Sequence, residues 1–171
     1  ENKCPGCHNP QSWDIHAGHT MTTEEILRPI LADPFADVTF TGGDPMMQPE
    51  GFTELAFAIR KQSTKTIWCY TGYTYEALLT MPAQRRLLEH IDVLVDGPFI
   101  QSLRDEQLRF RGSSNQRMID VQQSLKKKAV VESAVVLGAS GIVNQSRYRS
   151  KTIPAAGALV KEEDSAEKQT A

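Results

Sequence analysis

Apolar residues along the first two-thirds of the chain alternate between short strand-like runs and longer helical repeats. Three segments place apolar residues at helical spacing: 22–34, 49–62 and 74–91. Three short segments, rich in β-branched and aromatic residues, read as strands: 36–45, 64–73 and 91–99. Thr22 or Thr23 is a suitable cap for the first helix, and Pro82 predicts a break in the last.

Each predicted strand runs into glycine before the chain continues. The double glycine Gly42–Gly43, then Gly72 and Gly97, follow the three strands in turn. Strand, glycine turn and helix in this alternation predict an α/β fold with a parallel sheet, whose ligands gather at the carboxyl ends of the strands. Glycine after a strand is equally typical of a simple turn.

The last part of the chain follows no such pattern. From Leu125 onward the sequence is compatible with a helix or with one or two strands. Residues 161–171 are charged and lack apolar anchors, which favours disorder. We therefore expect one domain over residues 1–124 and an extension over 125–171.

The composition of the chain argues against some classes of binding partner. The chain has 171 residues and a formal net charge of -2, which gives no reason to expect nucleic acid or an anionic membrane. No apolar run approaches the roughly 20 residues that cross a bilayer. Three cysteines make a disulfide framework unexpected and favour the cytoplasm, and Cys69, within an apolar run, is expected in the core.

The other two cysteines open the chain as a pair, in "CPGCH". Cys4 and Cys7 followed by His8 match the pattern for covalent haem, although the strand–helix alternation argues against it. A redox pair would follow a strand. A zinc site would need two more ligands, for which His16 and His19 are the nearest candidates. An iron–sulfur cluster wants three or four thiolates.

Four stretches decide among these alternatives: "CPGCHNPQSW", "TFTGGDPMMQP", "IWCYTGY" and "DVLVDGPFIQSLRDEQLRFRGSSNQRMIDVQ". In this order they closely resemble the activating proteins of anaerobic ribonucleoside-triphosphate reductases, which are small radical S-adenosylmethionine enzymes. The resemblance runs from Glu1 to about Gln123. The combination of "VDGPF" and "FRGSSNQR" is specific to this branch, whereas "TGGDP" is shared among glycyl-radical activases.

The resemblance implies a fold and two cofactors. The fold would be a partial, open parallel α/β barrel of the radical S-adenosylmethionine type, lacking its first strand. Cys4 and Cys7 would be two of the three thiolates of a [4Fe–4S] cluster, and the family's first cysteine would fall immediately before Glu1. We therefore expect the chain as it stands to be poorly active.

The resemblance also assigns candidate cofactor residues. His8 would lie near the adenine of S-adenosylmethionine, and Thr41, Gly42, Gly43 and Asp44 would surround its methionine end. Thr71 and Asp96 are weaker candidates for the ribose or adenine. No role follows for Arg111 to Asn115, which would line the cofactor site, meet the reductase or form a turn.

The implied activity is that of an oxidoreductase. The cluster would deliver one electron to S-adenosylmethionine, and the resulting 5'-deoxyadenosyl radical would take a hydrogen atom from a glycine of the reductase. The partners would be that reductase and a low-potential electron donor. Two alternatives stay open: another small radical enzyme such as a pyruvate formate-lyase activase, or a truncated, non-catalytic module that binds the reductase or zinc.

Overall fold

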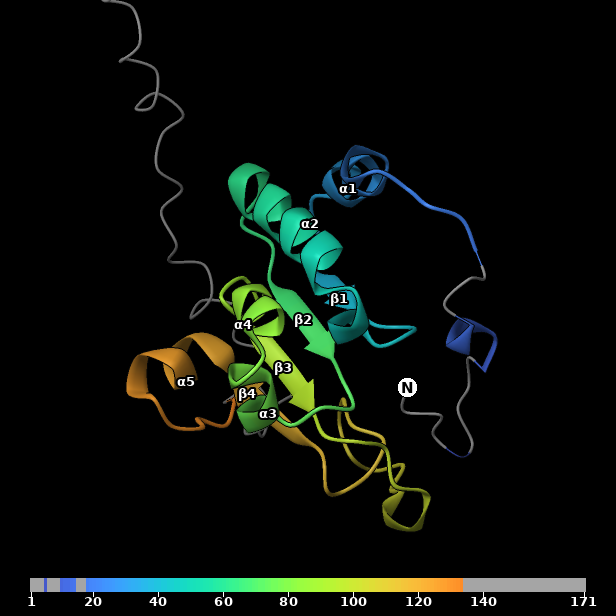
Figure 1. Ribbon diagram of the computed structural model, residues 1–171, viewed down its shortest axis with the longest axis vertical. Helices are drawn as coiled ribbons and strands as arrows, with labels where there is room; N and C mark the ends of the chain where they lie inside the picture. The colour runs from blue at the N-terminus through green and yellow to red at the C-terminus, as the bar shows by residue number, and fades with distance from the viewer. Residues whose placement is uncertain (1–4, 6–9, 15–17, 134–171) are drawn as a thin grey trace, which may run out of the picture.

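A four-stranded sheet forms the centre of the molecule (Figure 1), in a computed structural model that describes residue 5, residues 10–14 and residues 18–133. Its strands are β1 (Val38–Phe40), β2 (Ile67–Tyr70), β3 (Val93–Asp96) and β4 (Arg117–Asp120). They lie in the order β1-β2-β3-β4. The first three are parallel, as the strand–helix alternation predicts, and β4 is antiparallel to β3.

The helices cover one face of this sheet (Figure 1). They are α1 (Thr23–Ala32), α2 (Pro49–Gln62), α3 (Tyr75–Leu79), α4 (Pro82–Leu88) and α5 (Val121–Lys127). Three short 3-10 helices, η1 (Pro10–Trp13), η2 (Pro45–Met47) and η3 (Gln101–Leu103), occur in the connections. The expected α/β class is confirmed.

Local chemistry sets the helix ends as the sequence indicates. Thr22 caps α1 in a reciprocal capping box, in which its side chain accepts from the Glu25 amide and Glu25 accepts from the Thr22 amide. Pro82 divides the third helical segment, because it begins α4 at a position where no backbone N–H is needed. Both sequence expectations are therefore confirmed.

The two faces of the sheet differ in how they are covered. Strand residues such as Phe40, Ile67 and Leu94 join the large core beneath the helices. On the other face, Val93, Val95 and Met118 form a smaller cluster, with the half-buried Trp68 and Tyr70 packed against it. All four residues of β3 are buried, as its apolar sequence predicts for a strand covered on both faces.

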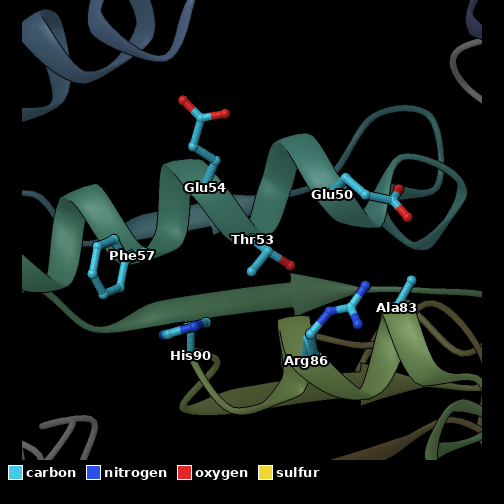
Figure 2. A pocket seen from close by; sticks show the side chains of 7 residues that line it. All are labelled: Glu50, Thr53, Glu54, Phe57, Ala83, Arg86 and His90. Atoms are coloured by element: carbon cyan, nitrogen blue, oxygen red, sulfur yellow. The ribbon is translucent and has the colours of Figure 1, made fainter.

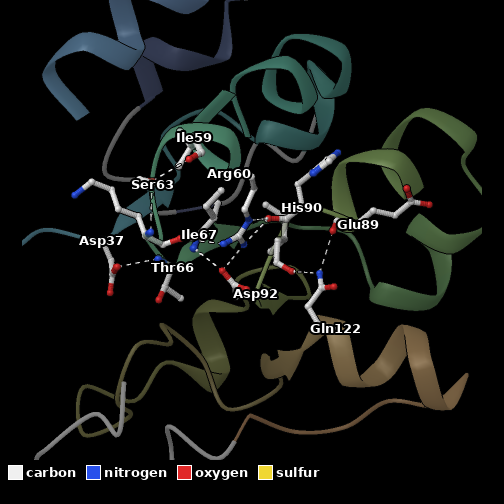
Figure 3. Close-up of polar contacts among 12 residues, drawn as sticks. Asp37, Ile59, Arg60, Ser63, Thr66, Ile67, Glu89, His90, Asp92 and Gln122 are labelled. Carbon is white, nitrogen blue, oxygen red and sulfur yellow. Dashed lines mark hydrogen bonds and ion pairs between the residues drawn. The ribbon is translucent and has the colours of Figure 1, made fainter. Parts of the chain in front are cut away.

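At the amino ends of β2 and β3, which we call the amino edge, an ion pair between the buried Asp92 and the partly buried Arg60 joins α2 to the sheet (Figure 3). Arg60 pairs with Asp92 and also donates to the backbone oxygens of His90 and Lys65. Asp92 in turn accepts from the Ile67 amide at 2.8 Å. These bonds satisfy groups that burial would otherwise leave unpaired.

The chain past β4 stays attached to the sheet for several residues. Helix α5 follows β4 directly and crosses positions 124 and 125, between which the sequence suggests a domain boundary. The amides of Asp120 and Ser133 donate to Val131 and Met118 oxygens at 2.9 and 2.8 Å. The rest of the expected extension, including the disordered tail over 161–171, lies outside the described residues.

Candidate functional site

Asp44 joins the turns that follow β1 and β2. One carboxylate oxygen accepts from the Met46 amide at 3.0 Å and so caps η2. The other accepts from the Thr71 hydroxyl at 3.0 Å and from the Gly72 amide at 2.9 Å. A single side chain therefore fixes the carboxyl ends of two neighbouring parallel strands against each other. We call the turns after β1, β2 and β3 the carboxyl edge.

The turn between β1 and Asp44 exposes its backbone. Thr41, Gly42 and Gly43 are all exposed, and Gly42 has φ 107°, a conformation that favours glycine. A Cβ atom at Gly42 would meet nothing within 4 Å. A ligand can therefore approach this backbone without a side chain in the way.

The same turn lies against the residues that follow the cysteine pair. A Cβ atom on Gly43 would lie 3.5 Å from the Ser12 backbone oxygen, so η1 and this turn are in van der Waals reach. Cys4, Cys7 and His8 are outside the described residues. The structure nevertheless brings the segment that begins directly after them to the carboxyl edge, where the sequence expects the cofactors.

Thr71 is buried and shapes the turn after β2. Its hydroxyl donates to Asp44 and accepts from the Tyr73 amide at 3.1 Å, while its own amide donates to the Val95 oxygen at 3.0 Å. These contacts give Thr71 a structural task at the site. The suggestion that it binds ribose or adenine stays a prediction.

Asp96 ends β3 as a buried anchor, 1% exposed. Its carboxylate accepts from the Tyr75 amide at 2.8 Å and from the Arg117 side chain. Arg117 also pairs with Glu76, and these two carboxylates together raise the pKa of the guanidinium. Asp96 thus fastens β4 and the start of α3 to the carboxyl edge, and its assignment to the cofactor stays a prediction.

Cys69, the third cysteine of the chain, is a core residue. It is fully buried in the main core, and burial, with a smaller contribution from Asp44, raises the pKa of its thiol far above the ordinary value. The expected core role is confirmed. No group of three or more metal-ligating side chains occurs in the described part of the chain, and His16 of the zinc alternative lies outside that part.

The residues from Arg111 to Asn115 build the loop that precedes β4. The Ser113 hydroxyl is buried and accepts from the Ile100 amide at 3.2 Å, while Asn115 donates to the Pro98 oxygen at 2.8 Å. Gly112 packs closely against the Phe99 ring, because a Cβ atom there would lie about 3.0 Å from the ring. Of the roles that the sequence leaves open, these contacts are those of a structural turn.

Sequence reasoning missed several residues of this edge. Gln116 accepts from the amides of Gly112 and Ser113 and donates to the Gly97 oxygen at 3.1 Å. Phe110 has φ 61° and packs its ring 5.2 Å from that of Trp68. The polar run "SSNQR" could have pointed to Gln116 as a residue of this loop. No local sequence pattern predicts a left-handed backbone conformation at a phenylalanine.

The residues fit the implied cofactors in chemistry. A cysteine pair matches the thiolate ligands that iron–sulfur clusters use. The exposed glycine backbone beside the segment that follows this pair suits the close approach of a polar ligand. Asp44, the next residue after this backbone, has both carboxylate oxygens engaged by the Met46 amide, the Thr71 hydroxyl and the Gly72 amide.

Comparison with known proteins gives a consistent result. The family model described as "4Fe-4S single cluster domain" matches residues 1–119. The anaerobic ribonucleoside-triphosphate reductase-activating protein of Vibrio cholerae is 38% identical over 125 residues, which cover 67% of this chain and 78% of that protein. Its counterpart in Salmonella typhimurium is 34% identical over 125 residues, with 67% and 79% covered.

A more distant relative belongs to a second kind of activase. The pyruvate formate-lyase-activating enzyme of Clostridium pasteurianum is 30% identical over 99 residues, covering 54% of this chain and 39% of that enzyme. No solved structure matches the chain. None of the helices in the described ranges has the length and apolar character needed to span a bilayer.

The resemblance read from the four sequence stretches is therefore confirmed. The family match spans the strands β1, β2 and β3, with the carboxyl-edge turns between them. The chain belongs to the 4Fe-4S single cluster domain family and, within it, to the anaerobic ribonucleoside-triphosphate reductase-activating proteins.

Proposed function

We propose that this protein is the activating enzyme of an anaerobic ribonucleoside-triphosphate reductase and installs a glycyl radical on it. The observation that carries the proposal is the exposed Thr41–Gly43 backbone, which lies against Ser12 at Gly43 and runs directly into Asp44, the residue that joins the turns after β1 and β2. The sequence places the cysteine pair immediately before this segment. The relatives' names supply the target.

Each residue at the carboxyl edge has a proposed task. Cys4 and Cys7 hold the cluster as thiolates, and His8 contacts the adenine end of S-adenosylmethionine. The backbone of Gly42 and Gly43 binds the methionine end, because no side chain blocks it. When bound, the cluster and S-adenosylmethionine supply the one-electron chemistry.

Asp44 follows this backbone directly and joins the turns after β1 and β2. Thr71 and Asp96 support the same edge from β2 and β3, and a direct contact of either with the ribose or adenine belongs to the proposal. The four-stranded sheet then represents part of an open barrel of the radical S-adenosylmethionine type. A low-potential electron donor and a cytoplasmic location complete the proposal, since reduced thiols persist in the cytosol.

The test is anaerobic reconstitution with iron and sulfide, followed by electron paramagnetic resonance of the reduced protein. The full gene product that contains this chain is measured with and without S-adenosylmethionine. We expect a [4Fe–4S] signal that shifts when S-adenosylmethionine is added. Gly42→Val should keep the cluster signal and lose the shift, because the side chain would cover the exposed backbone.

The matched control is Gly51→Ala in α2, where a Cβ atom meets nothing within 4 Å and the backbone is helical. It should leave both the signal and the shift unchanged. A protein that forms no cluster would overturn the proposal and favour the non-catalytic module. A cluster signal that does not shift when S-adenosylmethionine is added would overturn the assignment of the carboxyl edge as the binding site of that cofactor.

A further inference from the structure

The loop between β3 and β4, residues 97–116, has a shape fixed by its own hydrogen bonds. The Leu103 oxygen accepts from the Ser114 amide at 2.9 Å, and the bridge between Arg104 and Ser113 brings the two halves of the loop together. Gln116 closes its base through Gly112, Ser113 and Gly97. A long connection that is ordered internally is typical of a functional loop.

This ordered loop presents apolar side chains to solvent. Ile100 is 37% exposed, Leu103 41% and Phe110 46%. Phe110 also holds a left-handed backbone conformation, which costs about 1–2 kcal/mol for a residue with a Cβ atom. Phe110 packs against the Trp68 ring and is still 46% exposed, so the open part of its ring, together with Ile100 and Leu103, gives the loop an apolar surface.

Exposed apolar residues concentrate at the carboxyl edge of the sheet. The described residues include seven large exposed hydrophobic side chains, and four of these follow β1 or β3: Met47, Ile100, Leu103 and Phe110. In Figure 1 the arrowheads of β2 and β3 point toward the lower right, where the olive turn containing η3 projects from the molecule. The loop therefore extends from the same edge as the candidate cofactor site.

Direct contacts connect the loop to that site. The Gly97 amide donates to the Tyr73 oxygen at 2.9 Å, and the Tyr73 hydroxyl contacts the Met47 sulfur at 3.3 Å. Tyr73 follows Gly72, whose amide donates to Asp44. The loop thus has a fixed position relative to the exposed glycine backbone.

We propose that residues 97–116 form the surface on which the reductase docks, with Ile100, Leu103 and Phe110 as its apolar contacts. This inference rests on the proposed function, because that function requires a backbone glycine of another protein to reach the carboxyl edge. Exposed Arg104 and Arg109 flank the apolar residues. Aromatic residues and arginine are enriched where proteins bind one another.

A second candidate for a docking surface lies on the face of the sheet that the helices cover. A cavity of about 350 Å³ between α2 and α4 is lined by Glu50, Thr53, Glu54, Phe57, Ala83, Arg86 and His90 (Figure 2). Phe57 is 49% exposed, close to the value for Phe110. It lies away from the carboxyl edge and provides a matched comparison for the docking loop.

The test measures binding of the full gene product to purified anaerobic reductase by surface plasmon resonance, with and without reconstituted cluster. The variant Ile100→Asp/Leu103→Asp should raise Kd at least about ten-fold, as expected when central apolar contacts of an interface are lost. Phe57→Asp and Phe35→Asp should stay within about two-fold of wild type. Phe35 is 92% exposed and precedes β1, at the far end of that strand from the turn at Gly42.

Circular dichroism and the urea midpoint establish that each variant is folded, and Leu103→Ser replaces the double variant if that protein unfolds. Unchanged affinity in a folded loop variant, with activation of the reductase intact, would overturn the docking surface and leave the proposed function standing. Weakening by Phe57→Asp alone would place docking on the helical side and also overturn it. A wild-type full gene product that neither binds nor activates the reductase would overturn the proposed function as well.

Discussion

Strand β3 has a buried aspartate at each end, and the two differ in what surrounds them. Asp92, before the strand, is 3% exposed, and Asp96, its last residue, is 1% exposed. Each accepts a backbone amide and pairs with an arginine. The Arg60 side chain is 18% exposed, whereas that of Arg117 is 33% exposed and reaches the surface residue Glu76.

This difference in exposure matches the different roles of the two edges: the amino edge stabilises the core, and the carboxyl edge carries the candidate site. At the amino edge, Arg60 donates its remaining N–H groups to the backbone oxygens of Lys65 and His90. This pair therefore only stabilises the fold. At the carboxyl edge, Arg117 continues to the surface beside the docking loop. A buried aspartate next to glycine, as at Asp96, is therefore not by itself a sign of ligand binding.

The largest effect is expected at the amino edge. Asp92→Ala should lower the free energy of unfolding by about 3–5 kcal/mol, because it leaves the Arg60 guanidinium and the Ile67 amide without their buried partner. Urea denaturation measures the change. Asp37→Ala is the control, since the exposed Asp37 also accepts a backbone amide, that of Thr66 directly before β2, but forms no ion pair within the described residues. Equal losses in the two variants would contradict this account.

The corresponding change at the carboxyl edge should cost less. Asp96→Ala is expected to lower the free energy of unfolding by about 2–3 kcal/mol, because Arg117 is partly solvated and keeps Glu76 as a partner. The same denaturation experiment gives the value. A loss greater than that of Asp92→Ala would reverse the order of the two edges.

The glycine turn provides a sharper test of the carboxyl edge. Gly42→Ala should destabilise the protein by about 1–2 kcal/mol, because its φ of 107° is unfavourable for a residue with a Cβ atom. Gly51→Ala should instead stabilise it by about 0.5–1 kcal/mol, since that glycine lies in α2. Thermal unfolding compares the pair, and changes of the same sign would argue against the turn conformation.

The smallest effect concerns pH. Hydrogen bonding to Arg117 lowers the pKa of Glu76 below its ordinary value of 4.5, so the carboxylate stabilises the fold above that pH and loses this contribution as the pH falls through its folded pKa. Glu76→Gln should cost no more than about 1 kcal/mol at pH 7, because the side chain is 57% exposed.

Stability measured from pH 7 to pH 3 checks the sign. The gap between wild type and Glu76→Gln should narrow toward acid pH, because both side chains are then uncharged. A gap that widens toward acid pH would contradict the direction of the shift.

Much of the fold was predictable because local signals and packing agree. Thr22 and Pro82 mark helix ends with their own chemistry, and the apolar run of β3 matches its burial on both faces. Strand β4 escaped prediction because it begins at a charged Arg117 and passes directly into α5 without a glycine turn.

The site was predictable at the level of turns and less so at the level of contacts. The TGGDP motif identified the turn at Gly42, whose conformation the structure bears out. The partners of Asp44, which lie 27 and 28 positions away along the chain at Thr71 and Gly72, depend on the register between β1 and β2. Long-range pairing of this kind leaves no trace in a local pattern.

The buried thiol of Cys69 is a natural probe for local or global opening of the core. A thiol that is inaccessible and protonated reacts with an alkylating reagent only when the core opens, so its modification in native buffer follows the population of open molecules. Mass spectrometry can count that event at a single residue. The rate at which Cys69 is alkylated thus measures how often the sheet that carries the candidate site opens.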